Sequence, residues 1–258
     1  MANKLSIQNV SKSFPRPEQA GRILTVDKVS LEISENAFVS ILGPSGCGKS
    51  TLLNIIAGLE EPSDGQILVD GNRIRDRTAR FGYMFQKDLL FPWRTVEENV
   101  ALALEVRGDR KSTARTAAAK VLDRFGMGQF RTAYPAQLSG GMRQRVAIMR
   151  TLISDKEVLL LDEPFGALDA ITRAEMQRWL LDIWHQYCRT VLFVTHDVDE
   201  AIYLSDCVIL MSPRPGRISA EYPVDLPRPR DELTTTSPEF VKLKRAILGA
   251  FREQHVFG

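Results

Sequence analysis

One nine-residue segment constrains this chain most, because it joins an apolar strand to a helix through a glycine-rich loop. Residues 43–51 read Gly-Pro-Ser-Gly-Cys-Gly-Lys-Ser-Thr, after the apolar run 38–42 and before a helix-like stretch that begins at residue 52. Such a loop directs several backbone N–H groups and a helix N-terminus at one phosphate. Lys49 is expected to neutralise the β- and γ-phosphates, and Ser50 to offer its hydroxyl to Mg²⁺. The alternative, a chance glycine turn, is made weaker by the flanking strand and helix. The residues expected to bind nucleotide here are Gly43, Pro44, Ser45, Gly46, Cys47, Gly48, Lys49, Ser50 and Thr51.

The composition limits the class of protein and its partners. With 258 residues, 44% hydrophobic and 26% charged, the chain can bury one large core, with room for a subdomain. The net charge of +2 is small and the basic residues are scattered, so nothing supports a nucleic-acid partner. Three cysteines, at 47, 188 and 207, are too few for a disulfide framework or a zinc site and fit a reduced, cytosolic setting. No apolar run approaches the roughly 18 residues that span a bilayer and the N-terminus lacks a signal-peptide core, so we expect any membrane role to be exercised from outside the lipid.

The order of predicted elements before residue 153 indicates strands followed by a helical insertion. The alternating segments 5–10 and 29–33 suggest short antiparallel strands, and residues 15–22 are expected to form a loop. Two further strands are predicted at 65–71 and 81–85. From about residue 95 the pattern is helical, and we place the inserted helical segment at about 87–153.

After residue 157, strands and helices alternate again. The strands at 158–161 and 191–194 are apolar throughout, which indicates parallel strands that are buried on both faces between helices. The helix between them carries one apolar stripe, Trp179, Leu180, Ile183, Trp184 and Tyr187. The pattern therefore predicts an α/β core.

Asp162 and Glu163 stand where a buried strand ends, at the edge of the sheet where α/β proteins bind ligands. Asp162 can hold Mg²⁺ through water, and Glu163 can polarise the water that attacks the γ-phosphate. An acidic pair that merely opens a helix is the alternative, and the preceding phosphate loop argues against it.

A second anion site is predicted at Ser139-Gly140-Gly141. Ser139 is a good N-cap, and the two glycines leave the first amides of a helix uncovered. One chain has no use for two distant γ-phosphate sites, but two copies placed head to tail would each complete the other's site. An ordinary capped helix is the alternative.

These motifs, in this order, resemble the ATP-binding cassette (ABC) ATPases over residues 4–220. The resemblance implies an α/β P-loop NTPase with an ABC ATPase core, in which a mixed sheet is flanked by helices, an antiparallel β subdomain is attached and an α-helical subdomain is inserted. We therefore divide the chain into an ABC ATPase domain, 1–220, and a short C-terminal tail with one helix, 221–258. In that helix Phe240, Leu243, Ile247 and Phe251 share one face, which we expect to pack on the core.

The resemblance also implies roles for residues outside the phosphate loop. Phe14 stands where the family places an aromatic residue against adenine, although a core aromatic is the alternative. Gln86 matches the glutamine that reaches Mg²⁺ and links the core to the helical insertion. Asp169 ends the segment 166–169, which matches the loop that crosses the dimer interface. His196, at the end of a strand, matches the histidine that contacts the γ-phosphate, whereas a lone histidine there would be structural. The main departure from the common pattern is Met142, where many members carry Gln.

An apolar and aromatic segment at 88–94 occupies the position where the family docks a membrane subunit. Leu89, Leu90, Phe91 and Trp93 are the expected contacts, unless they only cover the helical subdomain. Together with Met211-Ser212-Pro213-Arg214-Pro215-Gly216-Arg217-Ile218, this segment resembles the bacterial importers of nitrate, sulfonates and taurine.

The resemblance thus implies an ATP-hydrolysing subunit that powers a bacterial importer, with ATP and Mg²⁺. Its catalytic residues would be Glu163, His196 and Lys49, and its metal-binding residues Ser50, Gln86 and Asp162. The chain would act as a homodimer on the cytoplasmic face of the inner membrane, under permease subunits and indirectly with a periplasmic binding protein. The alternatives are a soluble ABC ATPase that acts on nucleic acid or ribosomes, and a nucleotide kinase, which would leave Ser139 and His196 without a purpose.

Overall fold

The strands of the protein form two sheets in a computed structural model that describes residues 3–16, 21–74, 77 and 80–256. The antiparallel sheet has the order β2-β1-β4-β5. Its strands are β1 (Asn3–Pro15), β2 (Arg22–Ser34), β4 (Asp64–Val69) and β5 (Asn72–Arg73). The central sheet has the order β10-β9-β3-β8-β7-β6. Its strands are β3 (Phe38–Leu42), β6 (Phe81–Met84), β7 (Val158–Asp162), β8 (Thr190–Thr195), β9 (Cys207–Met211) and β10 (Ile218–Pro223).

The central sheet is mixed, because β10 runs antiparallel to β9 whereas the other neighbours are parallel. Every residue of β3, β7 and β8 is buried, as the apolar runs predict for strands covered on both faces. The α/β class and the parallel core are therefore confirmed.

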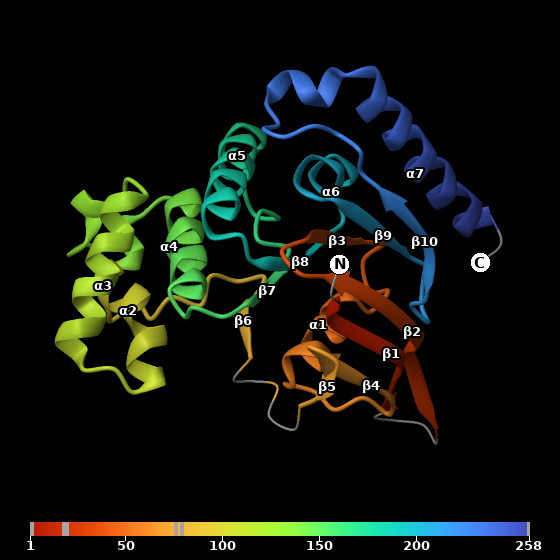
Figure 1. Ribbon diagram of the computed structural model, residues 1–258, viewed down its shortest axis with the longest axis horizontal. Helices are drawn as coiled ribbons and strands as arrows, with labels where there is room; N and C mark the ends of the chain where they lie inside the picture. The colour runs from red at the N-terminus through yellow and green to blue at the C-terminus, as the bar shows by residue number, and fades with distance from the viewer. Residues whose placement is uncertain (1–2, 17–20, 75–76, 78–79, 257–258) are drawn as a thin grey trace.

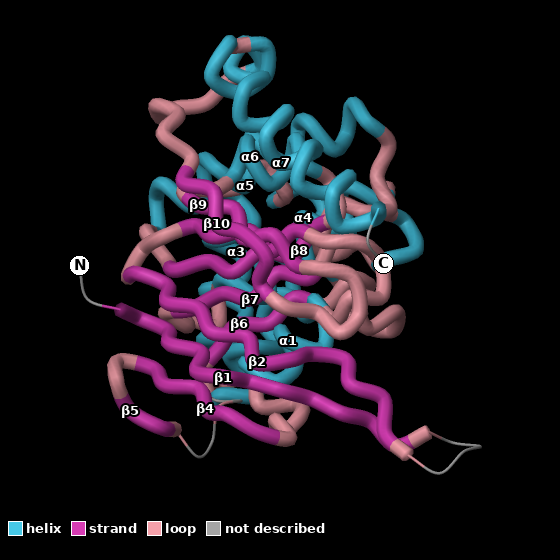
Figure 2. The backbone as a smooth tube through the Cα atoms, turned by 90° about the vertical axis from the view of Figure 1, so that its right-hand side faces the viewer, coloured by secondary structure: helices cyan, strands magenta, loops and turns pink. Residues whose placement is uncertain are grey.

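Helix α1 (Lys49–Ala57) lies between the two sheets, as Figure 2 shows. Leu52, Leu53 and Ile56 of this helix are buried in one cluster with Leu5 and Ile7 of β1. This cluster holds the antiparallel sheet against the first helix after the phosphate loop. The opposite face of the central sheet is covered by helices (Figure 1).

The helical insertion projects to one side of the molecule (Figure 1). It comprises α2 (Val96–Arg107), α3 (Lys111–Arg124), two short 3₁₀ helices (Gly128–Phe130 and Pro135–Gln137) and α4 (Gly140–Leu152). Thr95 begins α2 with a capping box: its hydroxyl accepts from the Glu98 amide, and the Glu98 carboxylate accepts from the Thr95 amide.

The C-terminal helices cover the central sheet. They are α5 (Ala170–Tyr187), α6 (Val198–Leu204), a 3₁₀ helix (Glu232–Thr236) and α7 (Pro238–Val256). Phe240 and Ile247 of α7 are buried in the same cluster as the helical insertion, and Leu243 and Phe251 pack against it. The expected packing of this face is confirmed.

An arginine ties the segment before α7 to α6. Arg230 is buried, and its guanidinium donates to the carbonyls of Ile202, Tyr203 and Ser205 at the end of α6 (2.8–3.0 Å). It thereby satisfies acceptors that a helix end leaves open. Burial is the main cause that lowers the pKa of Arg230, to about 10.

Some elements differ from the sequence-based expectations. β1 and β2 each contain 13 residues and are longer than the predicted segments 5–10 and 29–33. Within the predicted loop 15–22, residues 17–20 lie outside the described part of the chain. Strands β9 and β10 were not predicted. β10 runs from Ile218 to Pro223, across the boundary that we drew at residue 220, and the division into 1–220 and 221–258 stays a prediction.

Candidate functional site

The segment 43–51 runs from the end of β3 into the first turn of α1. Gly48 has φ +111°, and a Cβ at this position would lie 3.0 Å from the Thr25 carbonyl oxygen, so only glycine fits. Among the described residues, no side chain caps the first turn of α1, which leaves its N–H groups free for an anion. Lys49 is buried, and its Nζ donates to the carbonyls of Gly43 (2.8 Å) and Pro44 (3.0 Å).

An acidic pair meets this loop at the end of β7. The Ser50 hydroxyl donates to Asp162 Oδ1 at 3.0 Å, and Asp162 is buried. Burial raises the pKa of Asp162, and the hydrogen bond from Ser50 opposes that shift. Glu163 follows with φ +43°, a left-handed conformation that is costly for a residue with a side chain and is concentrated at functional sites. Its carboxylate Oε1 lies 3.8 Å from Lys49 Nζ.

Glu163 also contacts residues that follow the two strands on either side of β7. His196 follows β8, and its Nδ1 lies 3.2 Å from Glu163 Oε2. Gln86 follows β6, and its Nε2 donates to the same oxygen at 3.3 Å. β8, β7 and β6 are neighbouring parallel strands, so their carboxyl ends meet at one edge of the sheet. This topology brings Lys49, Gln86, Glu163 and His196 together from distant parts of the sequence.

A cleft of about 450 Å³ opens beside this group. It is lined by Phe14, Thr25, Ser45, Gly46, Gly48, Lys49, Ser50, Thr51, Gln86, Glu163 and Arg214. Phe14 therefore lies where a base could stack on it. Lys12 Nζ lies over the Phe14 ring, 5.0 Å from its centroid, in a cation–π contact. Two lining residues, Thr25 and Arg214, were not predicted as site residues.

Ser139, Gly140, Gly141 and Asp169 form a separate group, and none of them is among the described residues that line the cleft. Ser139 is the N-cap of α4, where its hydroxyl accepts from the Met142 amide at 3.3 Å. A Cβ on Gly141 would lie 2.7 Å from the Thr172 methyl group, so α4 begins directly against the start of α5.

Asp169 is the N-cap of α5 and accepts from the hydroxyl (2.7 Å) and the amide (3.1 Å) of Thr172. These two hydrogen bonds hold the pKa of Asp169 below its usual value. The N-termini of α4 and α5 thus meet at Thr172, where Gly141 is buried and Ser139, Gly140 and Asp169 stay exposed.

The residues at the cleft suit a Mg²⁺ ion. The Ser50 hydroxyl and the Asp162 carboxylate are in contact, and the Gln86 amide approaches the same strand ends. Oxygen donors are what Mg²⁺ prefers, and a buried carboxylate whose charged form is disfavoured gains most from a cation. Within the described chain no three His, Cys, Asp or Glu side chains cluster closely enough to hold a metal by themselves. Mg²⁺ at this edge would therefore need further oxygen ligands, which a bound phosphate supplies.

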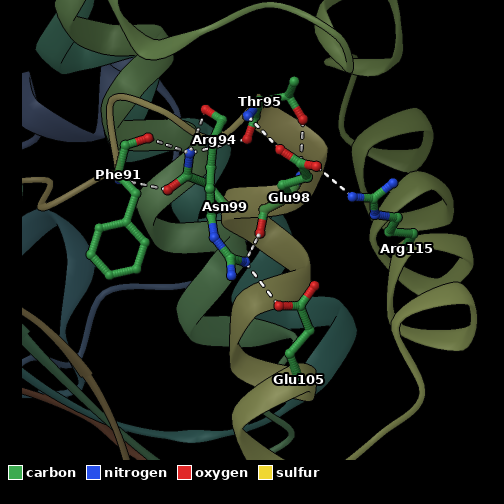
Figure 3. A network of polar contacts seen from close by, with 7 residues as sticks. All are labelled: Phe91, Arg94, Thr95, Glu98, Asn99, Glu105 and Arg115. Atoms are coloured by element: carbon green, nitrogen blue, oxygen red, sulfur yellow. Dashed lines mark hydrogen bonds and ion pairs between the residues drawn. The ribbon is translucent and has the colours of Figure 1, made fainter.

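The segment 88–94 is held in place by one buried amide, as Figure 3 shows. Asn99 of α2 is fully buried; it accepts from the Phe91 amide (2.7 Å) and donates to the carbonyls of Phe91, Arg94 and Thr95 (3.0–3.1 Å). Arg94 adds an ion pair with Glu105 at 2.9 Å.

This anchoring leaves part of the segment exposed. The Trp93 side chain is 71% exposed and that of Leu89 is 49% exposed. The rings of Phe91 and Trp93 stack with centroids 5.1 Å apart. Leu90 differs from the expectation: it is buried, 8% exposed, in the helical core, and cannot belong to a contact surface. The predicted contact at Leu90 is therefore withdrawn, and docking at Leu89, Phe91 and Trp93 stays a prediction.

No helix in the described ranges is both long and apolar enough to span a bilayer.

Comparisons with known proteins support a common origin along nearly the whole chain. The family described as ABC transporter matches residues 26–166. An uncharacterized ABC transporter ATP-binding protein of Methanocaldococcus jannaschii is 47% identical over 254 residues, 98% of this chain and 93% of that protein. An aliphatic sulfonates import ATP-binding protein of Bacillus cereus is 44% identical over 247 residues, 96% of this chain and 95% of that protein. A solved dimeric structure of an ATP-binding cassette in a post-hydrolysis state, bound to ADP and phosphate, is similar with a TM-score of 0.75. It is 33% identical and covers 86% of this chain and 99% of its own.

Proposed function

Since this chain belongs to the ABC transporter family and is an ATP-hydrolysing subunit of a transporter, we propose that it powers a bacterial importer of nitrate, a sulfonate, taurine or a related small nutrient. One observation carries the proposal: relatives named for aliphatic sulfonate import are 44% identical over 96% of the chain. The alternative of a soluble ABC ATPase that acts on nucleic acid or ribosomes is not favoured, because those relatives are named for import.

We assign the chemical step to the residues around Glu163. Glu163 would polarise the attacking water, because its carboxylate is the acidic group at the cleft that touches both His196 and Lys49. His196 would fix the geometry of the γ-phosphate from the neighbouring strand end. Lys49 would leave the carbonyls of Gly43 and Pro44 to neutralise the β- and γ-phosphates. Ser50, Gln86 and Asp162 would hold Mg²⁺, which neutralises charge on the phosphates when bound.

We propose that a second copy completes the site. Ser139, Gly140 and Asp169 are exposed, Gly141 is buried between the starts of α4 and α5, and none of these described residues lines this chain's own cleft. A helix N-terminus with free amides binds an anion well. In a head-to-tail homodimer each copy would offer this surface to the γ-phosphate held by its partner. The similarity to a dimeric cassette bound to ADP and phosphate supports this arrangement.

The membrane partner is proposed to dock on Leu89, Phe91 and Trp93. Trp93 is exposed and stacks on the half-buried Phe91, and an aromatic pair of this kind is typical of an interface anchor. Gln86 lies two residues before the segment 88–94 and donates a hydrogen bond to Glu163, so a movement of the segment would be transmitted to the catalytic edge. The protein would then work peripherally, at the cytoplasmic face of the inner membrane under permease subunits, with a periplasmic binding protein delivering the substrate.

Growth on defined nutrient sources tests the import proposal. Inactivation of the gene in the source organism is expected to abolish growth on one of nitrate, an alkanesulfonate or taurine, as the sole nitrogen or sulfur source. The wild-type gene should restore growth, and Glu163→Gln should not. Growth of the inactivated strain on every one of these sources would contradict the proposed substrate class.

A further inference from the structure

The loop between β9 and β10, residues 212–217, carries two arginines in different surroundings. Arg217 forms an ion pair with Asp27 of β2 and is not among the described residues that line the cleft. Arg214 lines the nucleotide cleft instead, together with Phe14 and residues of the phosphate loop. Within the described ranges, no carboxylate lies within ion-pair distance of Arg214. The cleft therefore contains a second cation besides Lys49, and nothing in the mechanism above uses it.

The loop is fixed against the phosphate loop and against β2. The Gly216 amide donates to the Thr25 carbonyl (2.9 Å), and the Asp27 amide donates to the Gly216 carbonyl (3.0 Å). A Cβ on Gly216 would clash with the carbonyl oxygen of Cys47, so the two loops are in direct contact. A hydrogen bond also joins the two ends of the loop, because the Ser212 hydroxyl accepts from the Arg217 amide at 3.1 Å. Arg214 is thus presented to the cleft by a backbone that is held at both ends.

Arg214 lies in the cleft against Thr25 of β2. Its Nη2 donates to the hydroxyl of Thr25 at 2.9 Å, and the Thr25 carbonyl abuts Gly48. Thr25 lies on β2, two residues after Ile23, which pairs with Phe14 of β1. Phe14 and Arg214 are therefore both held beside Ile23 and Thr25 of β2. Lys49, Gln86 and Glu163 line the same cleft and form the group where the β- and γ-phosphates are expected.

We propose that Arg214 binds the adenosine part of the nucleotide. This inference rests on the proposed placement of ATP in the cleft. A guanidinium is planar, stacks on aromatic rings and donates several hydrogen bonds, so it suits a purine base and its ribose. Thr25 orients the guanidinium through its hydroxyl. Phe14 and Arg214 would then hold the adenosine between two strands and one loop, while Lys49 holds the phosphates.

Calorimetric titration of the full-length protein tests this assignment, with Arg217→Ala as the matched control on the same loop. Arg214→Ala is expected to weaken binding of ATP and of ADP by the same factor, about tenfold, because both ligands share the adenosine. Arg214→Lys should recover only part of the affinity, since an ammonium cannot stack as a plane. Arg217→Ala should bind both nucleotides as the wild type does. Inorganic triphosphate, which lacks adenosine, should bind wild type and Arg214→Ala equally.

Three results would overturn the assignment. Unchanged affinity of Arg214→Ala for ATP and ADP would show that the guanidinium does not touch the nucleotide. A loss confined to ATP, or a loss of triphosphate binding, would place Arg214 on the phosphates. An equal loss in Arg217→Ala would show that the loop acts only through its fold. The growth test does not depend on Arg214. If Arg214 proves not to bind adenosine while the wild type still binds ATP, the import proposal is therefore unaffected.

Discussion

Replacement of Glu163 by Gln is the sharpest perturbation of the catalytic edge. The substitution exchanges one carboxylate oxygen for an amide nitrogen and keeps the size and shape of the side chain. Contacts to His196 and Gln86 can persist with a reoriented amide, and Lys49 retains the carbonyls of Gly43 and Pro44. The backbone conformation at residue 163 is unaffected. The substitution therefore removes the basicity of the group and little else.

The expected fall in the turnover rate follows from this loss of basicity alone. Loss of a general base lowers a turnover rate by about 10²–10⁴, which corresponds to about 3–5 kcal/mol of activation free energy. The free energy of unfolding should change by less than about 1 kcal/mol, because no buried contact is emptied. ATP affinity should be kept or improved, because a negative charge 3.8 Å from Lys49 is removed from a site for an anion.

Phosphate release in the presence of ATP and Mg²⁺ measures the rate, and gel filtration of the variant with ATP shows whether a dimer accumulates. Glu175→Gln, the same exchange at an exposed position on α5, is the matched control and should hydrolyse ATP as the wild type does. A Glu163→Gln variant that hydrolyses ATP within about tenfold of the wild type would remove Glu163 from the role of base. Loss of ATP binding in this variant would instead indicate a structural role.

Three further predictions concern the parts of the fold that surround the site. Arg230→Ala should lower the free energy of unfolding by about 3 kcal/mol, because three carbonyls at the end of α6 lose their donor. Chemical denaturation measures this, and a change below about 1 kcal/mol would contradict it. Asn99→Ala removes the side chain that holds segment 88–94. We therefore expect faster hydrogen exchange at the Phe91 amide and reduced capture of the membrane subunit. Unchanged exchange at that amide would argue against this role of Asn99. Iodoacetamide should modify the exposed Cys188 first, because burial raises the pKa of Cys207 to about 11, and Cys207 should react only as the pH approaches that value. Mass spectrometry at about pH 8 follows both thiols, and earlier reaction of Cys207 would refute the argument.

The catalytic edge was predictable because its residues stand directly after apolar strands. Parallel strands end at one edge, so Gln86, Glu163 and His196 had to meet once β6, β7 and β8 were placed side by side. The glycines of the phosphate loop were equally informative, since Gly48 adopts a conformation that other residues avoid. The structure brings these residues together, whereas the roles that we assign to them stay predictions.

Other features depend on tertiary contacts that a linear pattern does not report. Leu90 looked like part of an exposed apolar segment, but Asn99 turns the chain so that Leu90 enters the helical core. Arg214 was visible only as part of a family-like motif, because its position in the cleft is set by Gly216 packing against Cys47. Thr25 carried no signal at all, since a threonine in a strand is ordinary. Strand β10 is short, has no buried residue and lies at the edge of the sheet, so its pairing with β9 defines it more than its own sequence does.

The importer role can be tested by affinity purification of the tagged protein from detergent-solubilised membranes of its source organism, with and without ATP. We expect a polytopic membrane protein, encoded beside a periplasmic binding protein, to purify with the wild type. We also expect this partner to be lost when Phe91 and Trp93 are replaced by polar residues, in a variant that still folds and hydrolyses ATP. Recovery of soluble proteins or nucleic acid alone would contradict the importer and leave only the ATPase.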